Sequence, residues 1–198
     1  MKKVFLLSAL LILTAGCSAD DAGAGLSGGS ELVVNAADGP AARRPANARR
    51  GEILGEFSTE FTEKPENRAF NMKKAMDKLD GTIIGPGEEF SFNDALGPTN
   101  KAAGYKKAKI FVRGKDEMGY GGGICQVSST LFNACDFAGM EINERHDHSK
   151  PVSYVEKGRD AATSMNGPDF RFTNALDFPV KIITKFEKTK ITVSIAAA

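Results

Sequence analysis

A run of three glycines stands directly before a cysteine and an apolar segment, in the stretch GYGGGICQVSSTLFNAC. The glycines are Gly121, Gly122 and Gly123, and the cysteine is Cys125. A glycine run loses much backbone entropy on folding, so this position needs a bare backbone or conformations that other residues avoid. Apolar residues then recur at helical spacing over residues 124–138. The stretch therefore predicts a tight turn that opens a helix, with Cys125 in the first turn.

Two interpretations of this turn follow from the local residues. Unpaired N–H groups and the helix dipole at a helix N-terminus favour the reactive thiolate of Cys125, and glycine N–H groups can receive an oxyanion, as in an acyl-transfer site. Alternatively, the glycines allow close packing against a strand, and Cys125 is a small buried hydrophobe. Candidate substrate-binding residues are Tyr120, Gln126 and Ser128, although Ser128 and Ser129 also fit an ordinary helix surface.

A disulfide between Cys125 and Cys135 is not expected. Ten residues along one helix separate the two by about 15 Å. The Cα atoms of a disulfide lie within about 7 Å of each other.

Both histidines of the chain, His146 and His148, lie in the stretch ERHDHS. On a strand they would share one face, with Arg145 on the other. One of them could be the general base that activates Cys125. The spacing also permits a metal site with Cys125 or Asp160 as a further ligand, or an exposed strand without a role. We expect no metal, because no second cysteine or carboxylate has ligand-like spacing.

The polar turn KGRDAATSMNGPDF contributes Arg159 and Asp160. Asp160 could orient one of the histidines, which is the third role in a catalytic triad. A surface salt bridge between Arg159 and Asp160 is the competing explanation.

The N-terminal stretch MKKVFLLSALLILTAGCSAD places two lysines before an apolar run. The run is shorter than the roughly 20 residues of a membrane span but suits a secretory signal. It ends in LTAGC, which resembles a bacterial lipoprotein signal and implies cleavage after residues 1–16 and lipid on Cys17. An ordinary signal peptide with an incidental cysteine is the alternative. We expect an exported protein that is anchored to a membrane and faces the cell wall or periplasm.

Residues 17–50 are predicted to form a flexible tether, because they contain no aromatic residue and many alanines and glycines. The whole chain has 26 Lys and Arg against 25 Asp and Glu. Removal of Lys2 and Lys3 with the signal leaves 24 against 25, a charge of −1. A nucleic-acid partner is not expected at this balance. The sequence does not set an oligomeric state.

Residues 51–198 are predicted to form one α+β domain of mostly antiparallel strands. Alternation predicts strands in GEILGEFSTEF, AKIFV and MEINERHDHSKPVSYV, and GPGEEFSFNDALG fits a short strand between turns. FPVKIITKF and KITVSIA flank EKT as a C-terminal β-hairpin. ENRAFNMKKAMDKLDG predicts one helix in addition to the cysteine-bearing helix.

Five motifs then coincide in order and spacing: PGEEFSFNDALGP, AAGYKKAKIFV, GYGGGICQVSSTLFNAC, ERHDHSKPVSYVEKGRDA and DFRFTNALDFPVKI. Together they resemble the VanW-like domain family of exported bacterial cell-wall proteins, over about residues 53–195. The family was first named from glycopeptide-resistance gene clusters. The resemblance implies that residues 51–198 are a VanW-like catalytic domain.

The resemblance also implies an activity. It points to a cysteine-dependent peptidoglycan L,D-transpeptidase or L,D-carboxypeptidase that works through a thioester, cross-links the third residues of stem peptides and needs no cofactor. Cys125 would be the nucleophile, His148 the base with His146 ranked second, and Asp160 the orienting group. Arg145 and Arg159 would bind stem-peptide carboxylates. The alternatives are a non-catalytic peptidoglycan-binding or glycopeptide-resistance accessory domain and, third, a zinc amidase.

Overall fold

The computed structural model describes residues 48–198, except residues 63, 65, 113 and 114. The predicted signal over residues 1–16, Cys17 and nearly all of the predicted tether therefore lie outside the described residues. Among the residues that are described, no helix is both long enough and apolar enough to cross a membrane.

The strands of the described residues form three antiparallel sheets. The first contains, in spatial order, β1 (Ile53–Glu60), β9 (Lys190–Ala197), β8 (Val180–Phe186) and β2 (Ile83–Ile84). The second contains β3 (Glu89–Ser91), β7 (Arg171–Thr173) and β6 (Glu141–Glu144), and the third is the hairpin of β4 (Lys107–Val112) and β5 (Lys115–Tyr120). The helices are α1 (Glu66–Leu79), α2 (Phe92–Leu96) and α3 (Ile124–Phe137). The α+β class and the C-terminal hairpin are as predicted.

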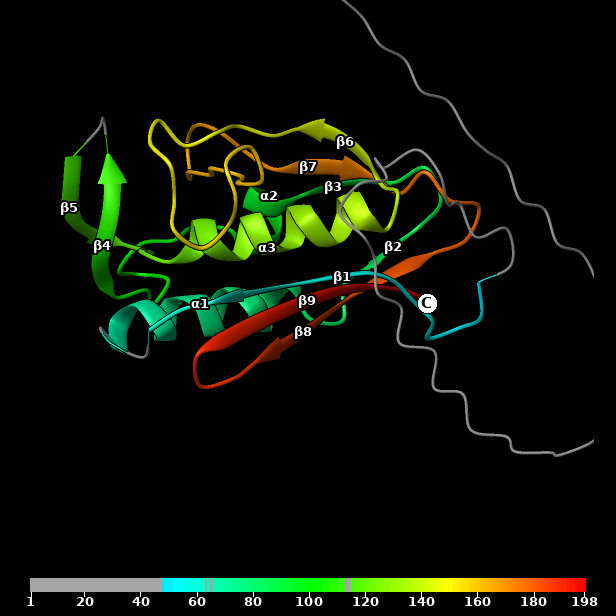
Figure 1. Cartoon of the computed structure of the whole chain (residues 1–198), viewed down its shortest axis with the longest axis horizontal. Coiled ribbons are helices and arrows are strands. Elements are labelled where there is room, and N and C mark those ends of the chain that lie inside the picture. Colours follow the sequence, from blue (N-terminus) through cyan, green and yellow to red (C-terminus); the bar gives the residue numbers. More distant parts are fainter. Residues whose placement is uncertain (1–47, 63, 65, 113–114) are drawn as a thin grey trace, which may run out of the picture. The chain divides into compact units, whose positions relative to one another are not determined.

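Helix α3 lies between the first and second sheets (Figure 1). Almost every residue from Ile124 to Cys135 is buried, whereas the sequence periodicity predicted one apolar side. The helix is covered on both sides (Figure 1), and its polar side chains are therefore buried as well as its apolar ones. The start of the helix lies at the end of the domain from which the β4–β5 hairpin projects (Figure 1).

Buried polar side chains fix α3 on strand β1. Gln126 Nε2 donates to Thr59 Oγ1 at 3.0 Å and to the Glu60 carbonyl at 2.8 Å. The hydroxyls of Thr130 and Thr59 form a further hydrogen bond of 2.8 Å. An unpaired buried polar group costs about 1–3 kcal/mol, so these bonds favour one position of the helix on the sheet.

Gly55 explains how closely β1 and α3 approach each other. A Cβ at this position would lie 2.4 Å from the Ala134 carbonyl oxygen and 2.4 Å from the Ala138 nitrogen. Only a residue without a side chain therefore allows this contact. Gly55 belongs to the set of alternate residues that the sequence placed on the buried side of the strand.

Helix α1 follows the prediction and carries one buried amide toward the site. Met72, Met76 and Leu79 are buried, as the periodicity indicates. The side chain of Asn71 accepts from the Lys106 N–H at 2.8 Å and donates to the Gly122 carbonyl at 3.1 Å. This amide therefore joins α1 to the glycine turn that precedes α3.

Two local predictions differ from the structure. The turn expected after β3 contains the short helix α2, because Phe92 and Leu96 bury the same face and the Ser91 hydroxyl accepts from the Asp94 N–H at 3.1 Å. The strand expected over MEINERHDHSKPVSYV ends at Glu144. Its continuation leaves the sheet and instead bonds to the segment around residues 160–162.

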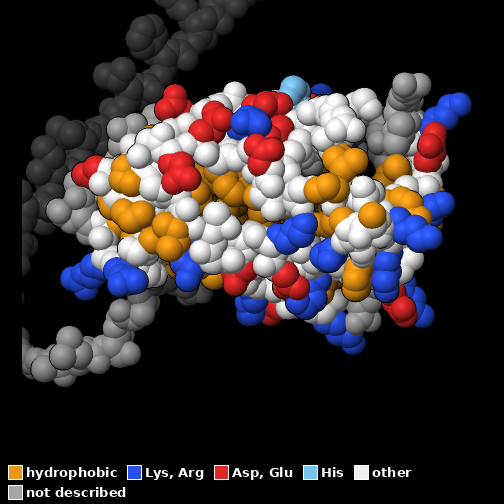
Figure 2. Space-filling model, turned by 180° about the vertical axis from the view of Figure 1, so that it is seen from behind, with side chains coloured by type: hydrophobic (Ala, Val, Ile, Leu, Met, Phe, Trp, Pro, Cys, Tyr) orange, Lys and Arg blue, Asp and Glu red, His pale blue; other side chains and the backbone are white. Residues whose placement is uncertain are grey.

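Charged side chains of both signs are present on the face that Figure 2 shows, with hydrophobic groups between them. This distribution agrees with the nearly neutral composition of the chain.

Candidate functional site

The glycine turn is buried and packed on two sides. Gly121 and Gly123 have φ of +80° and +109°, which disfavour other residues. Gly122 has no such φ, but a Cβ there would lie 2.5 Å from the Lys109 carbonyl oxygen. A Cβ on Gly123 would lie 3.0 Å from the Arg68 Cγ. The positive φ of Gly121 and Gly123 and the close packing of Gly122 on β4 and Gly123 on α1 are therefore sufficient to explain the triplet.

Cys125 is the second residue of α3 and is partly exposed. Its thiol lies 3.4 Å from the Thr163 carbonyl oxygen, to which it donates. Cys125 and the buried Cys135 are both free thiols, in agreement with the expectation that they do not pair.

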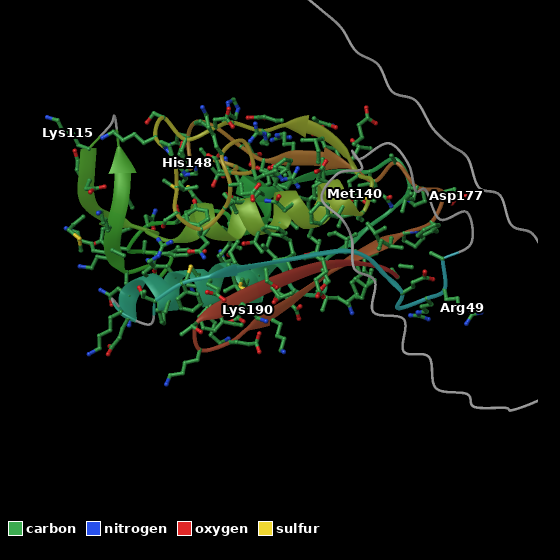
Figure 3. All side chains as sticks on the ribbon, viewed as in Figure 1. Arg49, Lys115, Met140, His148, Asp177 and Lys190 are labelled. Atoms are coloured by element: carbon green, nitrogen blue, oxygen red, sulfur yellow. The ribbon has the colours of Figure 1, made fainter. Side chains whose placement is uncertain are left out.

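His148 and Asp160 are hydrogen-bonded to each other and lie next to Cys125. The Nδ1 of His148 lies 2.6 Å from Asp160 Oδ2, and the same oxygen accepts the backbone N–H of His148 at 2.7 Å. The side chains of His148 and Asp160 are only 11% and 9% exposed. His148 lies close enough to Cys125 for each side chain to shift the pKa of the other, and because Asp160 holds Nδ1, the Nε2 is the nitrogen left to face the thiol. In Figure 3, His148 lies toward the start of α3, away from Met140, which follows the helix.

The electrostatics of the three groups favour an ionised pair. Burial opposes ionisation of the Cys125 thiol, but the neighbouring His148 outweighs it and lowers the thiol pKa. Burial also acts against the His148 imidazolium, but the neighbouring Cys125 and Asp160 raise its pKa. Burial acts to raise the Asp160 pKa, yet the backbone and ring N–H groups of His148 hold it below its ordinary value. Each shift stabilises the charged form of its group.

His146 is not part of this group. It does not share a strand face with His148, because both residues lie beyond the end of β6. Its Nε2 contacts Glu144 Oε1 at 2.9 Å, and its side chain is 46% exposed. Among the described residues, no group of three or more histidine, cysteine, aspartate or glutamate side chains is arranged to hold a metal ion.

Polar side chains of α3 hold the segment that carries Asp160. The Ser128 hydroxyl donates to the Ala161 carbonyl at 2.6 Å, and the Ser129 hydroxyl accepts the Ala161 N–H at 2.9 Å. One turn further, Asn133 Nδ2 donates to the Arg159 carbonyl at 2.8 Å. The helix therefore positions both Cys125 and Asp160.

Arg145 and Arg159, the predicted carboxylate partners, bind groups of the protein itself. Arg145 donates to the Asp160 carbonyl at 2.5 Å and pairs with Asp147 at 2.7 Å. Arg159 donates to Asn133 Oδ1 at 2.5 Å and to Asp136 Oδ2 at 2.6 Å. These contacts attach the loop to α3 and to itself.

The remaining predicted site residues differ in how far their side chains are exposed. Tyr120 ends β5, is 37% exposed, and has Lys107 Nζ 5.6 Å from its ring centroid. Gln126 is buried and binds β1, and Ser128 is buried and binds Ala161. Of the three, only Tyr120 presents an exposed side chain.

Sequence reasoning missed two side chains beside Cys125. Arg68 comes from α1 and donates through Nη2 to Gln126 Oε1 at 2.6 Å. Tyr154 lies near Cys125, and burial together with the charge of Cys125 raises the pKa of its phenol far above the ordinary value. Tyr154 stands in the motif ERHDHSKPVSYVEKGRDA but was given no role, and Arg68 lies outside all five motifs.

A groove of about 330 Å³ lies elsewhere, on the outer face of the first sheet, where it is lined by residues such as Ser58, Thr192 and Ser194. Thr59 contacts α3, so its neighbour Ser58 points to the opposite face of the sheet. The groove is therefore separate from the cysteine cluster, and the chemistry of the site does not involve it.

Fold and site together define an α+β domain in which a buried helix carries a cysteine next to a histidine–aspartate pair. Residues 67–196 match the family described as VanW like protein, and the chain belongs to this family. The resemblance noted in the sequence motifs is thereby confirmed.

Two relatives illustrate the similarity. The uncharacterised protein YoaR of Bacillus subtilis (strain 168) is 46% identical over 132 residues, which cover 67% of this chain and 44% of YoaR. The vancomycin B-type resistance protein VanW of Enterococcus faecalis (strain ATCC 700802 / V583) is 34% identical over 131 residues, covering 64% of this chain and 48% of that protein. The matched part thus spans less than half of either relative. No solved structure matches the chain.

Proposed function

We propose that this domain is a cysteine-dependent acyltransferase of peptidoglycan, an L,D-transpeptidase or L,D-carboxypeptidase. The observation that carries the proposal is the hydrogen-bonded pair of His148 and Asp160 beside the partly exposed Cys125 at the start of α3. Together the three residues could supply a nucleophile, a base and a carboxylate that orients the base. The choice of peptidoglycan as the substrate rests on the family resemblance and not on the geometry of the site.

The reaction follows from these roles. The Cys125 thiolate attacks the carbonyl carbon of the third stem residue, and the C–N bond to the terminal D-alanine breaks. The imidazolium of His148 gives its proton to the departing amine, and a thioester remains on Cys125. An amine from a second stem, or water, then attacks the thioester while His148 accepts its proton. The products are a cross-link or a shortened stem, and the free thiol returns.

Backbone donors near the thiol support oxyanion stabilisation. Two of these N–H groups are already used within the turn, because Ile124 donates to the Gly121 carbonyl and Gln126 to the Gly123 carbonyl. The N–H of Gly122 has no hydrogen-bond acceptor among the described residues. A backbone N–H next to a nucleophile is a suitable partner for the developing oxyanion.

A test compares the purified full-length protein with its Cys125→Ala and His148→Ala variants on a disaccharide-tetrapeptide. Mass spectrometry would follow D-alanine loss, cross-linked dimer and an acyl adduct on Cys125. We expect both variants to lose turnover, while His146→Ala, the matched control, retains it because His146 contacts Glu144 instead.

A second candidate is a non-catalytic accessory domain, favoured by the name of the relative VanW, a vancomycin B-type resistance protein. The glycine triplet is compatible with it, because positive φ angles and close packing account for the glycines without a catalytic role. If the wild-type protein binds the tetrapeptide but gives neither an adduct nor a product, and Cys125→Ala binds equally well, this second candidate replaces the first.

A further inference from the structure

Arg68 contributes a guanidinium beside the thiol that has no role in the mechanism above. Its Nη2 bonds to the side chain of Gln126, the residue that follows Cys125. Its Cγ lies where a side chain on Gly123 would need space, so Arg68 passes directly over the first residue before α3. The thiol of Cys125 and the phenol of Tyr154 are the groups whose charge acts on it.

Arg68 is a partly buried cation without a carboxylate partner. Burial lowers the pKa of its guanidinium, and the opposing effects come from Tyr154 and Cys125 rather than from an aspartate or glutamate. Among the described residues, no ion pair includes Arg68. Partial burial of an uncompensated charge is unfavourable, so an anion from outside the chain would be stabilised here.

The other two arginines near the cluster each already pair with a carboxylate of the protein. Arg145 and Arg159 bind loop carbonyls and the side chains of Asp147 and Asp136. A guanidinium offers five N–H donors, and the structure records one of those of Arg68 in use, toward Gln126. Arg68 therefore retains the paired donors that fit a carboxylate.

We propose that Arg68 binds the free C-terminal carboxylate of the residue that leaves when Cys125 attacks the substrate. This inference rests on the proposed function. The reacting carbonyl must approach the thiolate to about 3–3.5 Å, and one residue of extended chain spans about 3.3–3.6 Å. The terminal carboxylate thus falls within one residue of Cys125, in the region that Arg68 and Gln126 border.

A selectivity follows from this arrangement. The site would prefer a peptide that ends one residue after the scissile bond, because only that peptide places a carboxylate on Arg68. A peptide with an amidated end leaves the guanidinium without its anion. Gly123 has a second purpose under this proposal, since its missing side chain leaves room for Arg68.

The binding test uses the full-length Cys125→Ala protein and two forms of the disaccharide-tetrapeptide, the free acid and the C-terminal amide. Calorimetry should show the acid binding about 10–100-fold more tightly, the range for a charge-assisted hydrogen-bonded pair. Adding Arg68→Gln should abolish this preference and leave the affinity for the amide unchanged. Adding Arg159→Gln instead, as the matched control, should preserve the preference.

Arg68→Lys protects the test against misfolding, because it keeps the charge but loses the planar fork. It should retain a reduced preference for the acid. Equal affinities for acid and amide with Arg68 present would overturn the inference. So would an equal loss of affinity for both peptides in Arg68→Gln, because that result indicates a structural role.

The outcome is separable from the fate of the proposed function. The binding assay requires no turnover, so a preference for the acid without any reaction supports the Arg68 site and removes the enzyme. Conversely, an adduct on Cys125 formed with equal kcat/KM from acid and amide supports the enzyme and removes the Arg68 site.

Discussion

At the scale of single residues, the cluster is a set of charges that stabilise one another. The lowered pKa of Cys125 and the raised pKa of His148 both favour the thiolate–imidazolium pair. Asp160 keeps its charge and accepts two hydrogen bonds from His148. Loss of any one charge therefore disfavours ionisation of the others.

The first prediction concerns the pH dependence of thiol reactivity. Only the thiolate reacts with iodoacetamide, so the alkylation rate of Cys125 should rise with pH around a midpoint below the ordinary thiol value of 9.0. Asp160→Asn removes a group that raises the His148 pKa, and less imidazolium then faces the thiol. The midpoint should therefore move to higher pH, and His148→Ala should move it in the same direction.

Asp147→Asn is the control for this prediction, because Asp147 is 62% exposed and pairs with Arg145 rather than with His148. Its midpoint should equal that of the wild-type protein. The buried Cys135, whose pKa burial raises well above the ordinary value, should stay unmodified. An unchanged midpoint in Asp160→Asn would show that the carboxylate does not act on the thiol.

The structure brings together Cys125, His148 and Asp160, which the sequence named as candidates, but it adds neighbours that the sequence did not indicate. Cys125, His148 and Asp160 stand in motifs with few alternatives, since the chain has only two histidines. Arg68 and Gln126 lie 58 positions apart, and no local pattern distinguishes this arginine from others on an exposed helix face. Contacts between distant segments depend on the packing of α1 against α3, which periodicity does not specify.

At the scale of elements, α3 is a helix whose polar side chains are as buried as its apolar ones. Gln126 and Thr130 bind β1, whereas Ser128, Ser129 and Asn133 bind the segment over residues 159–161. The sequence predicted the helix and its apolar stripe correctly. It did not predict that the polar side would also be covered, because that depends on a loop from a later part of the chain.

The second prediction tests the contact between β1 and α3. Gly55→Ala should lower the free energy of unfolding by about 1–3 kcal/mol or more, because its Cβ would overlap backbone atoms of Ala134 and Ala138 that cannot rotate away. Urea denaturation measures the change. Gly85→Ala is the matched control, since a Cβ there meets only the end of the Glu88 side chain. Equal stability of the two variants would contradict the close approach.

The third prediction concerns the loop that carries Asp160. Arg159→Ala removes bonds to Asn133 and Asp136 and should destabilise the protein by about 1–3 kcal/mol, the range for hydrogen bonds to charged groups. Amide exchange should become faster over residues 159–163, because the segment loses its attachment to α3.

Lys109→Ala serves as the comparison for Arg159→Ala, because the exposed Lys109–Asp116 pair should contribute at most about 1 kcal/mol. If Arg159→Ala leaves both stability and exchange unchanged, the guanidinium does not hold the loop. That result would instead favour the substrate-binding role that the sequence suggested for Arg159.

At the scale of the whole molecule, the folded unit extends beyond the part that matches the family. The match begins at residue 67, whereas β1 pairs with β9 along nearly its whole length. Without β1, the strand β9 would expose an unpaired edge. The alternation of residues predicted this strand. Only the folded structure identifies β9 as its partner.

The fourth prediction concerns where the domain works. We propose that Cys17 carries lipid, so the full-length protein expressed in a bacterial cell should sediment with membranes and require detergent for release. Cys17→Ala should move it to the soluble fraction, while Ser18→Ala, the neighbouring control, should leave it on the membrane. A Cys17→Ala protein that still sediments with membranes would assign the anchor to another segment.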